Sequence, residues 1–185
     1  MKAVFGLGNP GLKYVLTRHN VGFQVIGLYR KINPTRSRAV RTCLSLVYRA
    51  EDLLLVKPMT HMNASGDGVK AVLERFQIDY ADALIVYDDL DLPLGKMRIL
   101  PKGGAGTHKG MTSIVARLES EEIPRIRIGI GGLSWPPDTI DYVLGRFTPD
   151  EWTQLLPTLR QAVEAIDTFR LSDINTVMNK FNERR

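Results

Sequence analysis

Several residue types and patterns on which common sites depend are missing from this sequence. Its 185 residues include a single cysteine, Cys43, so an intramolecular disulfide and a cluster of zinc-binding cysteines are both excluded. No apolar run is long enough to cross a membrane, and the first residues lack the apolar core of a secretory signal. We therefore expect a soluble, cytoplasmic protein with no membrane contact.

Acidic residues are absent from positions 1–50, although the whole chain has 20 of them against 25 lysines and arginines. The cations of this segment are Lys2, Lys13, Arg18, Arg30, Lys31, Arg36, Arg38, Arg41 and Arg49. A basic segment of this kind suggests a phosphate-bearing partner, most often nucleic acid. The alternative is a solvated basic face without a partner.

Two glycine-rich segments lack what nucleotide-binding loops need. The segment 6–11, Gly-Leu-Gly-Asn-Pro-Gly, has the glycine spacing of a dinucleotide fingerprint, but no acidic residue follows about twenty positions later. Pro10 also removes a backbone N–H where that motif's helix would begin. The segment 102–110 lacks the glycine-lysine-Ser/Thr ending of a phosphate-binding loop. A nucleotide-dependent oxidoreductase is therefore disfavoured.

Motifs for a serine nucleophile or a histidine-bound metal are also missing. No Gly-x-Ser-x-Gly turn is present, and the three histidines form no His-x-x-x-His pair. We therefore expect a site that uses no metal and no cofactor.

Apolar residues and turn residues follow a pattern that is typical of an α/β domain. Short apolar runs predict strands at 2–5, 44–48, 53–56, 83–87, 97–100 and 126–130. Apolar side chains at helical spacing predict helices from about 21 to 29, 65 to 76, 111 to 118, 152 to 169 and 172 to 181. Ser65 is expected to cap the second helix, residues 33–40 to form a loop, and Pro136-Pro137 to break the chain. A hairpin through 49–52 adds antiparallel pairs, so we expect one domain with a mixed sheet.

Polar side chains with useful chemistry gather in four loops, each at the end of a predicted strand. The loops are 6–19, 57–63, 88–91 and 102–110. In open α/β sheets, sites form where loops leave the carboxyl ends of neighbouring strands. If the four strands are neighbours in one sheet, the loops converge on one crevice.

His19 is the leading candidate for a catalytic base within these loops. A single histidine is more often structural, but His19 lies between the cation Arg18 and the amides of Asn9 and Asn20. Asp88, the first carboxylate after a predicted strand, could fix the tautomer of His19 and stabilise its imidazolium form. The residues alone thus predict a hydrolase that acts on an anionic substrate.

Two asparagines in the loops have both a structural and a functional interpretation. Asn9 and Asn63 are turn formers by default. Alternatively, their amide N–H groups bind a carbonyl oxygen of a peptide-like substrate or a developing oxyanion.

Four groups of residues resemble the signatures of bacterial peptidyl-tRNA hydrolases. These are 6–11 with Tyr14 and Thr17-Arg18-His19-Asn20-x-Gly22-Phe23; Lys57-Pro58-x-Thr60-x-Met62-Asn63-x-Ser65-Gly66; Asp88-Asp89-Leu90-Asp91-Leu92-Pro93-x-Gly95 with the glycine loop through His108-x-Gly110; and Arg125-x-Arg127-Ile128-Gly129-Ile130-Gly131. They occur in the family's order and span nearly the whole chain.

The resemblance implies an enzyme that cleaves the ester between a peptide and the 3′ ribose of its tRNA, and so recycles peptidyl-tRNA released from ribosomes. It implies a single α/β domain over residues 1–185, with a twisted mixed β-sheet surrounded by helices, of the phosphorylase/hydrolase-like kind. It also implies a monomer that needs no metal, no cofactor and no obligatory protein partner.

Residue roles follow from the same resemblance. His19 is implied as the general base, Asp88 as the group that stabilises its working form, and Asn9 as the group that distinguishes blocked from free aminoacyl groups. Tyr14 and Asn63 are implied as substrate contacts. Arg127 matches a residue that holds the tRNA 5′-phosphate; its lysine partner aligns with Leu100, and Lys102 nearby is a substitute.

The sequence departs from the family pattern at two further positions. His61 stands where the family has an aromatic residue, and Lys109, after His108, stands where it has an asparagine. We expect His61, His108 and Lys109 to contact substrate. The two departures keep an alternative open, a catalytically weak RNA-binding relative of the same fold.

Overall fold

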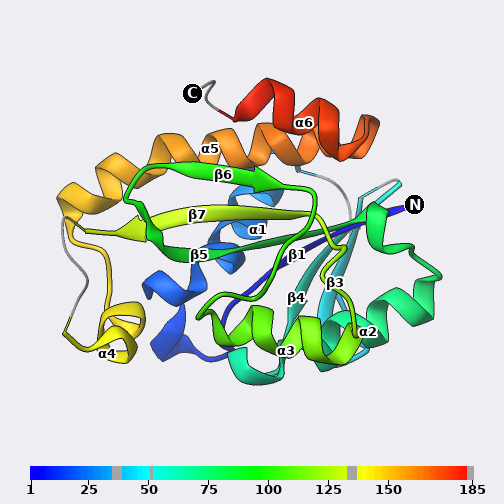
Figure 1. Ribbon diagram of the computed structural model, residues 1–185, viewed down its shortest axis with the longest axis horizontal. Helices are drawn as coiled ribbons and strands as arrows, with labels where there is room; N and C mark the ends of the chain where they lie inside the picture. Colours follow the sequence, from blue (N-terminus) through cyan, green and yellow to red (C-terminus); the bar gives the residue numbers. More distant parts are fainter. Residues whose placement is uncertain (35–38, 51, 133–136, 183–185) are drawn as a thin grey trace.

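A seven-stranded mixed sheet runs through the molecule in the computed structural model, which describes residues 1–34, 39–50, 52–132 and 137–182 (Figure 1). The strand order is β2-β3-β4-β1-β5-β7-β6. The strands are β1 (Lys2–Gly6), β2 (Ala39–Thr42), β3 (Ser45–Ala50), β4 (Leu53–Pro58), β5 (Ala83–Pro93), β6 (Met97–Leu100) and β7 (Arg125–Gly131). Strands β4, β1, β5 and β7 are parallel, whereas β2, β3 and β6 add antiparallel pairs at the two edges. The predicted α/β fold with a mixed sheet is confirmed.

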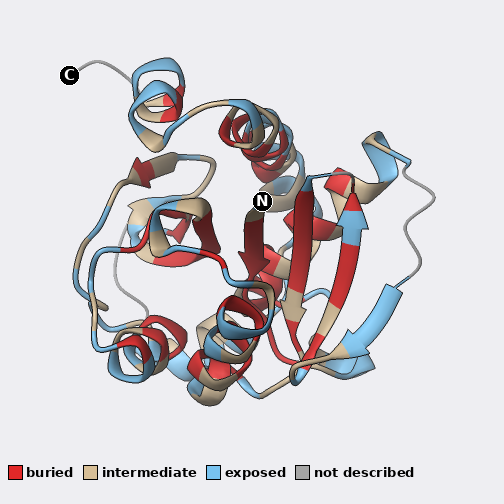
Figure 2. Ribbon diagram, turned by 90° about the vertical axis from the view of Figure 1, so that its right-hand side faces the viewer, coloured by how far each residue is buried: buried red, intermediate tan, exposed pale blue. Residues whose placement is uncertain are grey.

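Helices cover both faces of the sheet (Figures 1 and 2). They are α1 (Val21–Ile32), α2 (Ser65–Phe76), α3 (Lys109–Leu118), α4 (Thr139–Leu144), α5 (Pro149–Leu171) and α6 (Ile174–Phe181), with short 3-10 turns η1 (Leu12–Tyr14), η2 (Arg18–Asn20), η3 (Met62–Ala64) and η4 (Tyr80–Asp82). Apolar residues of α1, α5 and α6 form one core with the sheet, and those of α2 and α3 form the other. Both faces of the central strands are therefore buried, as expected for parallel strands. Among the described residues, no helix is both long and apolar enough to cross a membrane.

Three predicted elements differ from the structure. Strand β5 has 11 residues, so Asp88 and Asp89 lie within it and not after it. Strand β2 occupies positions 39–42, at the end of the segment expected to be a loop. Ser65 is the first residue of α2, and its Oγ donates to the carbonyl of Met62 at 2.8 Å, so the predicted cap is wrong. The chain enters α2 directly from η3, which leaves no extended residue for a side-chain cap.

Some predicted helix bounds also differ from the structure. Helix α5 begins at Pro149 and not at Trp152, because Thr148 forms a capping box with Glu151. Helix α4 was not predicted, although Asp138 caps it through the N–H groups of Ile140 and Asp141. The expected break at Pro136, the turn residue Glu51 and positions 35–38 of the expected loop lie outside the described residues.

Strand order decides which of the four polar loops meet. Strands β4, β1 and β5 are neighbours and parallel, so the loops after β1 and β4 open at the same end of the sheet as the carboxylates of β5. Strand β6 is separated from them by β7 and runs antiparallel to it. The segment after β6 therefore crosses back over the sheet before it reaches α3 (Figure 1).

Two glycines let α1 start close to the sheet. A Cβ atom on Gly22 would lie 2.3 Å from both the N atom of Leu7 and the O atom of Val86, and one on Gly6 would lie 2.2 Å from the O atom of Gly22. The N–H of Phe23 donates to the carbonyl of Leu7 at 3.1 Å. The turn η2, which carries His19 and directly precedes α1, is thereby held against β1 and β5.

Candidate active site

A pocket of about 530 Å³ opens where β1, β4 and β5 end. The loop after β1 contributes Asn9, η2 contributes His19, and the loop after β4 contributes Met62 and Asn63. Residues 88–91 of β5, residues 103–109 and residues 139–140 and 143–144 of α4 complete most of the wall. Three of the four polar loops thus meet as expected, and the fourth reaches the pocket by its return over the sheet.

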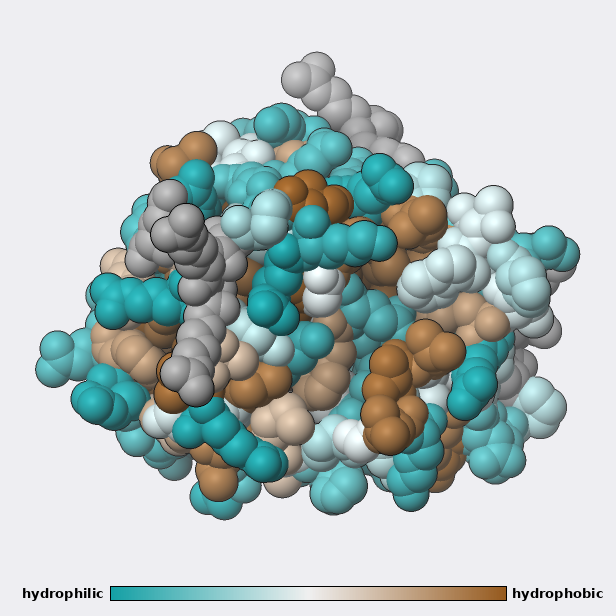
Figure 3. Space-filling view, turned by 180° about the vertical axis from the view of Figure 1, so that it is seen from behind, coloured by the Kyte–Doolittle hydropathy of each residue, from teal (hydrophilic) through white to brown (hydrophobic). Residues whose placement is uncertain are grey.

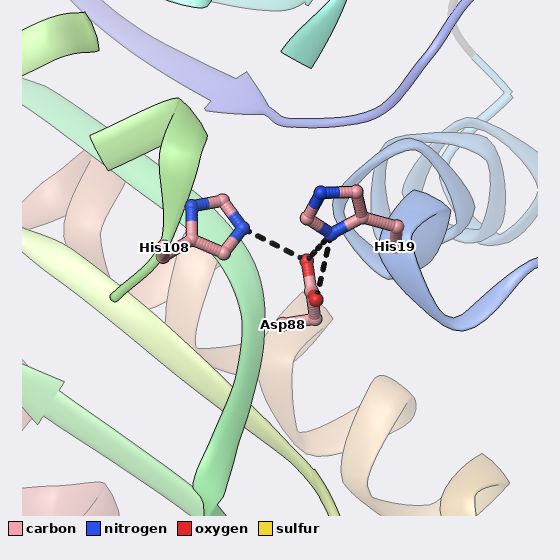
Figure 4. A group of neighbouring side chains, drawn as sticks. All are labelled: His19, Asp88 and His108. Atoms are coloured by element: carbon pink, nitrogen blue, oxygen red, sulfur yellow. Dashed lines mark hydrogen bonds and ion pairs between the residues drawn. The ribbon is translucent and has the colours of Figure 1, made fainter. Parts of the chain in front are cut away.

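Asp88 lies between two histidines that come from different parts of the chain (Figure 4). The Nδ1 atom of His19 is 2.8 and 3.0 Å from the two carboxylate oxygens, and the Nε2 atom of His108 is 3.0 Å from Oδ1. The Asp88 side chain is 2% exposed, so its charge is almost entirely removed from water. Its pairing with His19 was predicted from the loop arrangement; its contact with His108 was not.

The neighbours of the two imidazoles determine where their protons lie. The N–H of Met111 donates to Nδ1 of His108 at 3.1 Å, so the proton of a neutral His108 is on Nε2 and is donated to Asp88. His19 donates its Nδ1 proton to Asp88. Its Nε2 atom is directed away from Asp88 and carries the free lone pair (Figure 4). This is the tautomer that a general base requires.

Burial and charge act in opposite directions on this pair. Burial acts to raise the pKa of Asp88, but the two histidines outweigh it, so this pKa lies well below the ordinary value of 3.8. Burial also acts to lower the pKa of His19, but the charge of Asp88 and its hydrogen bond outweigh burial and raise this pKa above 6.5. The charge of Lys109 lowers the pKa of His19 to a lesser degree. Asp88 is therefore ionised, and His19 is a stronger base than a free histidine.

Asn9 is held so that one amide group remains available to a ligand. Its backbone N–H donates to Oδ1 of Asn20 at 2.8 Å, and Nδ2 of Asn20 donates back to its carbonyl at 2.9 Å. Its side-chain Oδ1 accepts the N–H of Met62 at 2.8 Å. The Nδ2 group of Asn9 is thus left as a donor at the pocket wall, close to the loop that carries the exposed Asn63.

Arg18 fixes the segment that carries His19. Its guanidinium donates to both carboxylate oxygens of Glu151 at 2.8 and 2.9 Å and lies 4.3 Å from the ring centroid of Tyr142. Its backbone N–H donates to the carbonyl of Gly145 at 2.9 Å. These contacts join η2 to α4 and α5, so the base and the α4 wall of the pocket are held by the same residue.

The cations expected to bind phosphate have carboxylate partners. Arg127 lines the pocket and pairs through Nε with Asp89, while its Nη2 atom is 3.9 Å from Asp91. The exposed Lys102 pairs with Glu122 at 2.9 Å and does not line the pocket. The two do not meet at one phosphate position in this structure, and the pairing of Arg127 with β5 carboxylates was not predicted.

The other expected substrate contacts divide into two groups. Asn63, His108 and Lys109 line the pocket, whereas Tyr14 and His61 do not. Tyr14 is half-buried in η1, where the ammonium of Lys13 lies 4.8 Å from its ring centroid, and His61 is exposed. The α4 wall was missed, although the capping residue Asp138 before an apolar run was a usable signal.

His19, Asp88 and His108 also offer three potential metal-ligand atoms, all within 4.8 Å of one another. The proton positions argue against such a use. A metal on Nε2 of His108 would require the ring proton on Nδ1, where the N–H of Met111 already points. The donor set therefore suits a hydrogen-bonded base better than a metal site.

Comparisons with known proteins agree over the whole length of the chain. The family model described as peptidyl-tRNA hydrolase matches residues 3–185. A peptidyl-tRNA hydrolase of Chloroflexus aurantiacus is 43% identical over 187 residues, which cover 98% of this chain and 99% of the relative. One from Listeria monocytogenes is 40% identical, with 100% of both chains covered. The crystal structure of peptidyl-tRNA hydrolase from Acinetobacter baumannii has a TM-score of 0.91 at 28% identity and covers 100% of this chain and 96% of that one.

Proposed function

The chain belongs to the peptidyl-tRNA hydrolase family, and from this premise we propose that the pocket around His19 is its active site. The protein is an enzyme that hydrolyses the ester between peptide and tRNA in peptidyl-tRNA released from ribosomes. The alternative, a catalytically weak RNA-binding relative, is not favoured because the similar proteins are named as hydrolases. The proposal rests above all on one observation: the Nδ1 proton of His19 is held by a buried carboxylate, while Nε2 has no hydrogen-bond partner in the part of the chain that the structure describes.

The reaction begins with proton transfer from water to His19. Nε2 accepts a proton as the water oxygen attacks the ester carbonyl, and the carbonyl becomes a tetrahedral oxyanion. Asp88 stabilises the resulting imidazolium through the Nδ1 hydrogen bond. The C–O bond to the ribose then breaks, and the imidazolium returns its proton to the departing 3′ oxygen. The products are a peptide with a free carboxyl group and a tRNA with a free 3′ hydroxyl group.

Donors on the pocket wall stabilise the negative charge of the tetrahedral species. The Nδ2 group of Asn9 is oriented by the contact of its Oδ1 with Met62, and Asn63 lies on the same loop. Lys109 adds a positive charge at the first residue of α3. Fixed donors and charges of this kind act on the charge that develops in the transition state.

Replacing Lys109 by asparagine is expected to move the acidic limb of the pH–rate profile to higher pH. Burial is the strongest influence on the pKa of His19, but Lys109 also lowers it, so removal of the charge raises this pKa. More of His19 is then protonated and inactive below pH 7, and kcat/KM at pH 6 falls a few-fold. Measurement of kcat/KM from pH 5 to 9 checks this. An acidic limb that stays in place, or moves to lower pH, contradicts it.

The remaining assignments concern the surroundings of the pocket. We propose that residues 1–185 form one catalytic domain that acts as a monomer. We place the enzyme in the cytoplasm, where ribosomes release its substrate. Arg127 and His108 are proposed to face the substrate from the pocket wall. Tyr14, His61 and Lys102 lie outside the pocket and are proposed to contact the parts of the tRNA or peptide that extend beyond it.

The direct test is hydrolysis of a defined substrate. The purified protein should release N-acetylated amino acid from N-acetyl-aminoacyl-tRNA at least about 10³-fold faster than buffer does. It should also cleave the same ester on a short CCA oligonucleotide in the presence of EDTA, because no step uses a metal. Aminoacyl-tRNA with a free amino group is the control, and it should be cleaved far more slowly. Release at the buffer rate would contradict the function.

A further inference from the structure

Three cations lie together on the sheet face that α1 covers, outside the pocket. We call Arg30, Arg41 and Lys57 the α1-face cluster. In the register of β2, β3 and β4, Arg41 pairs with Leu46, and Leu46 pairs with Lys57, so the three side chains share one face of the sheet. Figure 3 views the molecule from the opposite side to Figure 1 and shows hydrophilic residues interspersed with hydrophobic ones.

The side chain of Lys57 packs against α1. Its Nζ atom lies 3.9 Å from the position that a Cβ of Gly27 would occupy and 5.3 Å from the ring centroid of Phe23. The ammonium therefore lies directly against the backbone of α1. Burial, and then the nearby charge of Arg30, lower the pKa of Lys57 to about 8. Arg30 and Lys57 are thus two half-buried cations that repel each other.

Arg30 is held in its position by an aromatic ring. Its guanidinium carbon lies 3.7 Å from the ring centroid of Tyr48, which follows Leu46 on the same face of β3. Stacking leaves the N–H groups at the rim of the guanidinium available for an anion. Among the described residues, Arg30 is therefore oriented by the ring of Tyr48 and not by a carboxylate.

Neither Arg30 nor Lys57 has a negatively charged partner among the described residues. Other partly buried arginines are satisfied: Arg18 by Glu151, Arg127 by Asp89, and Arg125 by three backbone carbonyls. Two like charges that are half-buried and unpaired destabilise a fold unless an anion joins them. The acid-free segment 1–50 supplies no such anion from its own side chains.

We propose that the α1-face cluster binds phosphate groups of the tRNA backbone. The inference rests on the proposed function and extends it to an RNA contact separate from the catalytic pocket. Helix α1 begins directly after η2, and Arg30 is about 14 Å further along its axis. The cluster thus contacts phosphates at some distance from the ester. Arg41 is exposed and lies two strands from Lys57, so a second phosphate can be held.

Charge-removing variants test the cluster. In Lys57→Gln and in Arg30→Gln, KM for peptidyl-tRNA is expected to rise about fivefold or more, with kcat unchanged. The plot of log affinity for deacylated tRNA against log salt should lose about one unit of slope. The ester on the short CCA oligonucleotide should be cleaved as by the parent enzyme. Lys31→Gln is the matched control, because Lys31 is exposed on α1 and forms no hydrogen bond or ion pair with the residues that the structure describes.

The outcomes separate this inference from the proposed function. If Lys57→Gln and Arg30→Gln both behave like Lys31→Gln, the phosphate site is overturned and the hydrolase function is unaffected. If the parent enzyme cleaves no ester, the function fails, while the tRNA-binding measurement still decides the site. A competition experiment tests the kind of anion. If polyglutamate displaces tRNA as well as an unrelated RNA does, at equal concentrations of negative charge, the cluster is assigned to acidic polypeptides, and this also overturns the proposal.

A second variant of Lys57 distinguishes loss of phosphate binding from a purely structural effect. Lys57→Met keeps the side-chain length and removes the ammonium. Because an unpaired half-buried charge is lost, the melting temperature should stay the same or rise while tRNA affinity falls about fivefold or more. A role of Lys57 in packing alone predicts a lower melting temperature and unchanged tRNA affinity, and that result would overturn the proposal.

Discussion

Replacing His19 by alanine is expected to lower kcat for peptidyl-tRNA hydrolysis by about 10³-fold. The variant loses the only group in the pocket that combines a free ring nitrogen with a buried carboxylate behind it, among the described residues. The imidazole of His108 cannot replace it, because one of its nitrogens accepts the N–H of Met111 and the other donates to Asp88. KM should change little, since tRNA is bound largely outside this position.

Single-turnover hydrolysis at saturating enzyme measures this effect without interference from product release. His19→Gln is the matched variant: its amide can donate to Asp88 but cannot accept a proton from water at neutral pH, so it should be as inactive as alanine. Added imidazole should restore part of the activity of the alanine variant by entering the vacated space. Retention of more than a tenth of the parent rate by either variant would refute His19 as the base.

Replacing Asp88 by asparagine is expected to lower kcat by about 10² to 10⁴-fold. Asp88 accepts a hydrogen bond from each histidine, whereas an asparagine has only one acceptor oxygen, and its NH₂ group would face the second N–H. One of the two imidazoles must then change its tautomer or move. If this is His19, the proton is transferred to Nε2 and the base is lost.

The pH dependence distinguishes this electrostatic role from a simple loss of shape. Asp88 raises the pKa of His19 against the opposing effect of burial, so removal of the charge lowers that pKa. The acidic limb of kcat/KM should therefore move to lower pH, although the maximum rate is smaller. Asp79→Asn is the control for the same chemical change, because Asp79 is exposed and precedes the start of β5, whereas the pocket residues lie in the later part of that strand. An unmoved acidic limb, or a rate within fivefold of the parent, would contradict the role of Asp88.

The sequence predicted the parts of the site that follow from strand ends. His19 and Asp88 were placed together because each lies where a polar segment adjoins a buried strand, and neighbouring parallel strands bring such segments to one edge. The fold class and the family were also correct, since periodicity and multi-residue motifs are local features of the chain. The bounds of β5 were wrong because its acidic residues remain in the sheet through pairing with β7, which no local propensity encodes.

The parts that could not be predicted depend on contacts between distant segments. The hydrogen bond of His108 with Asp88 needs the chain after β6 to return over the sheet. The partners of Arg127 depend on the register of β7 against β5, a pairing that shifts beyond Asp89. Ser65 had the right residue type for a cap, but the preceding 3-10 turn removed the geometry. The first two depend on tertiary structure, whereas the third depends on the turn that directly precedes the helix.

The central place of β1 in the sheet has a consequence for synthesis. This strand is made first, yet both of its neighbours, β4 and β5, come later in the chain. At about 5–20 residues per second, the ribosome takes several seconds to add the roughly fifty residues that separate β1 from β4. During that time the apolar strand and the His19 segment behind it have no sheet to join. The nascent chain therefore exposes its catalytic segment to chaperones and proteases before any of the pocket exists, and slower translation through residues 7–52 should lengthen that exposure.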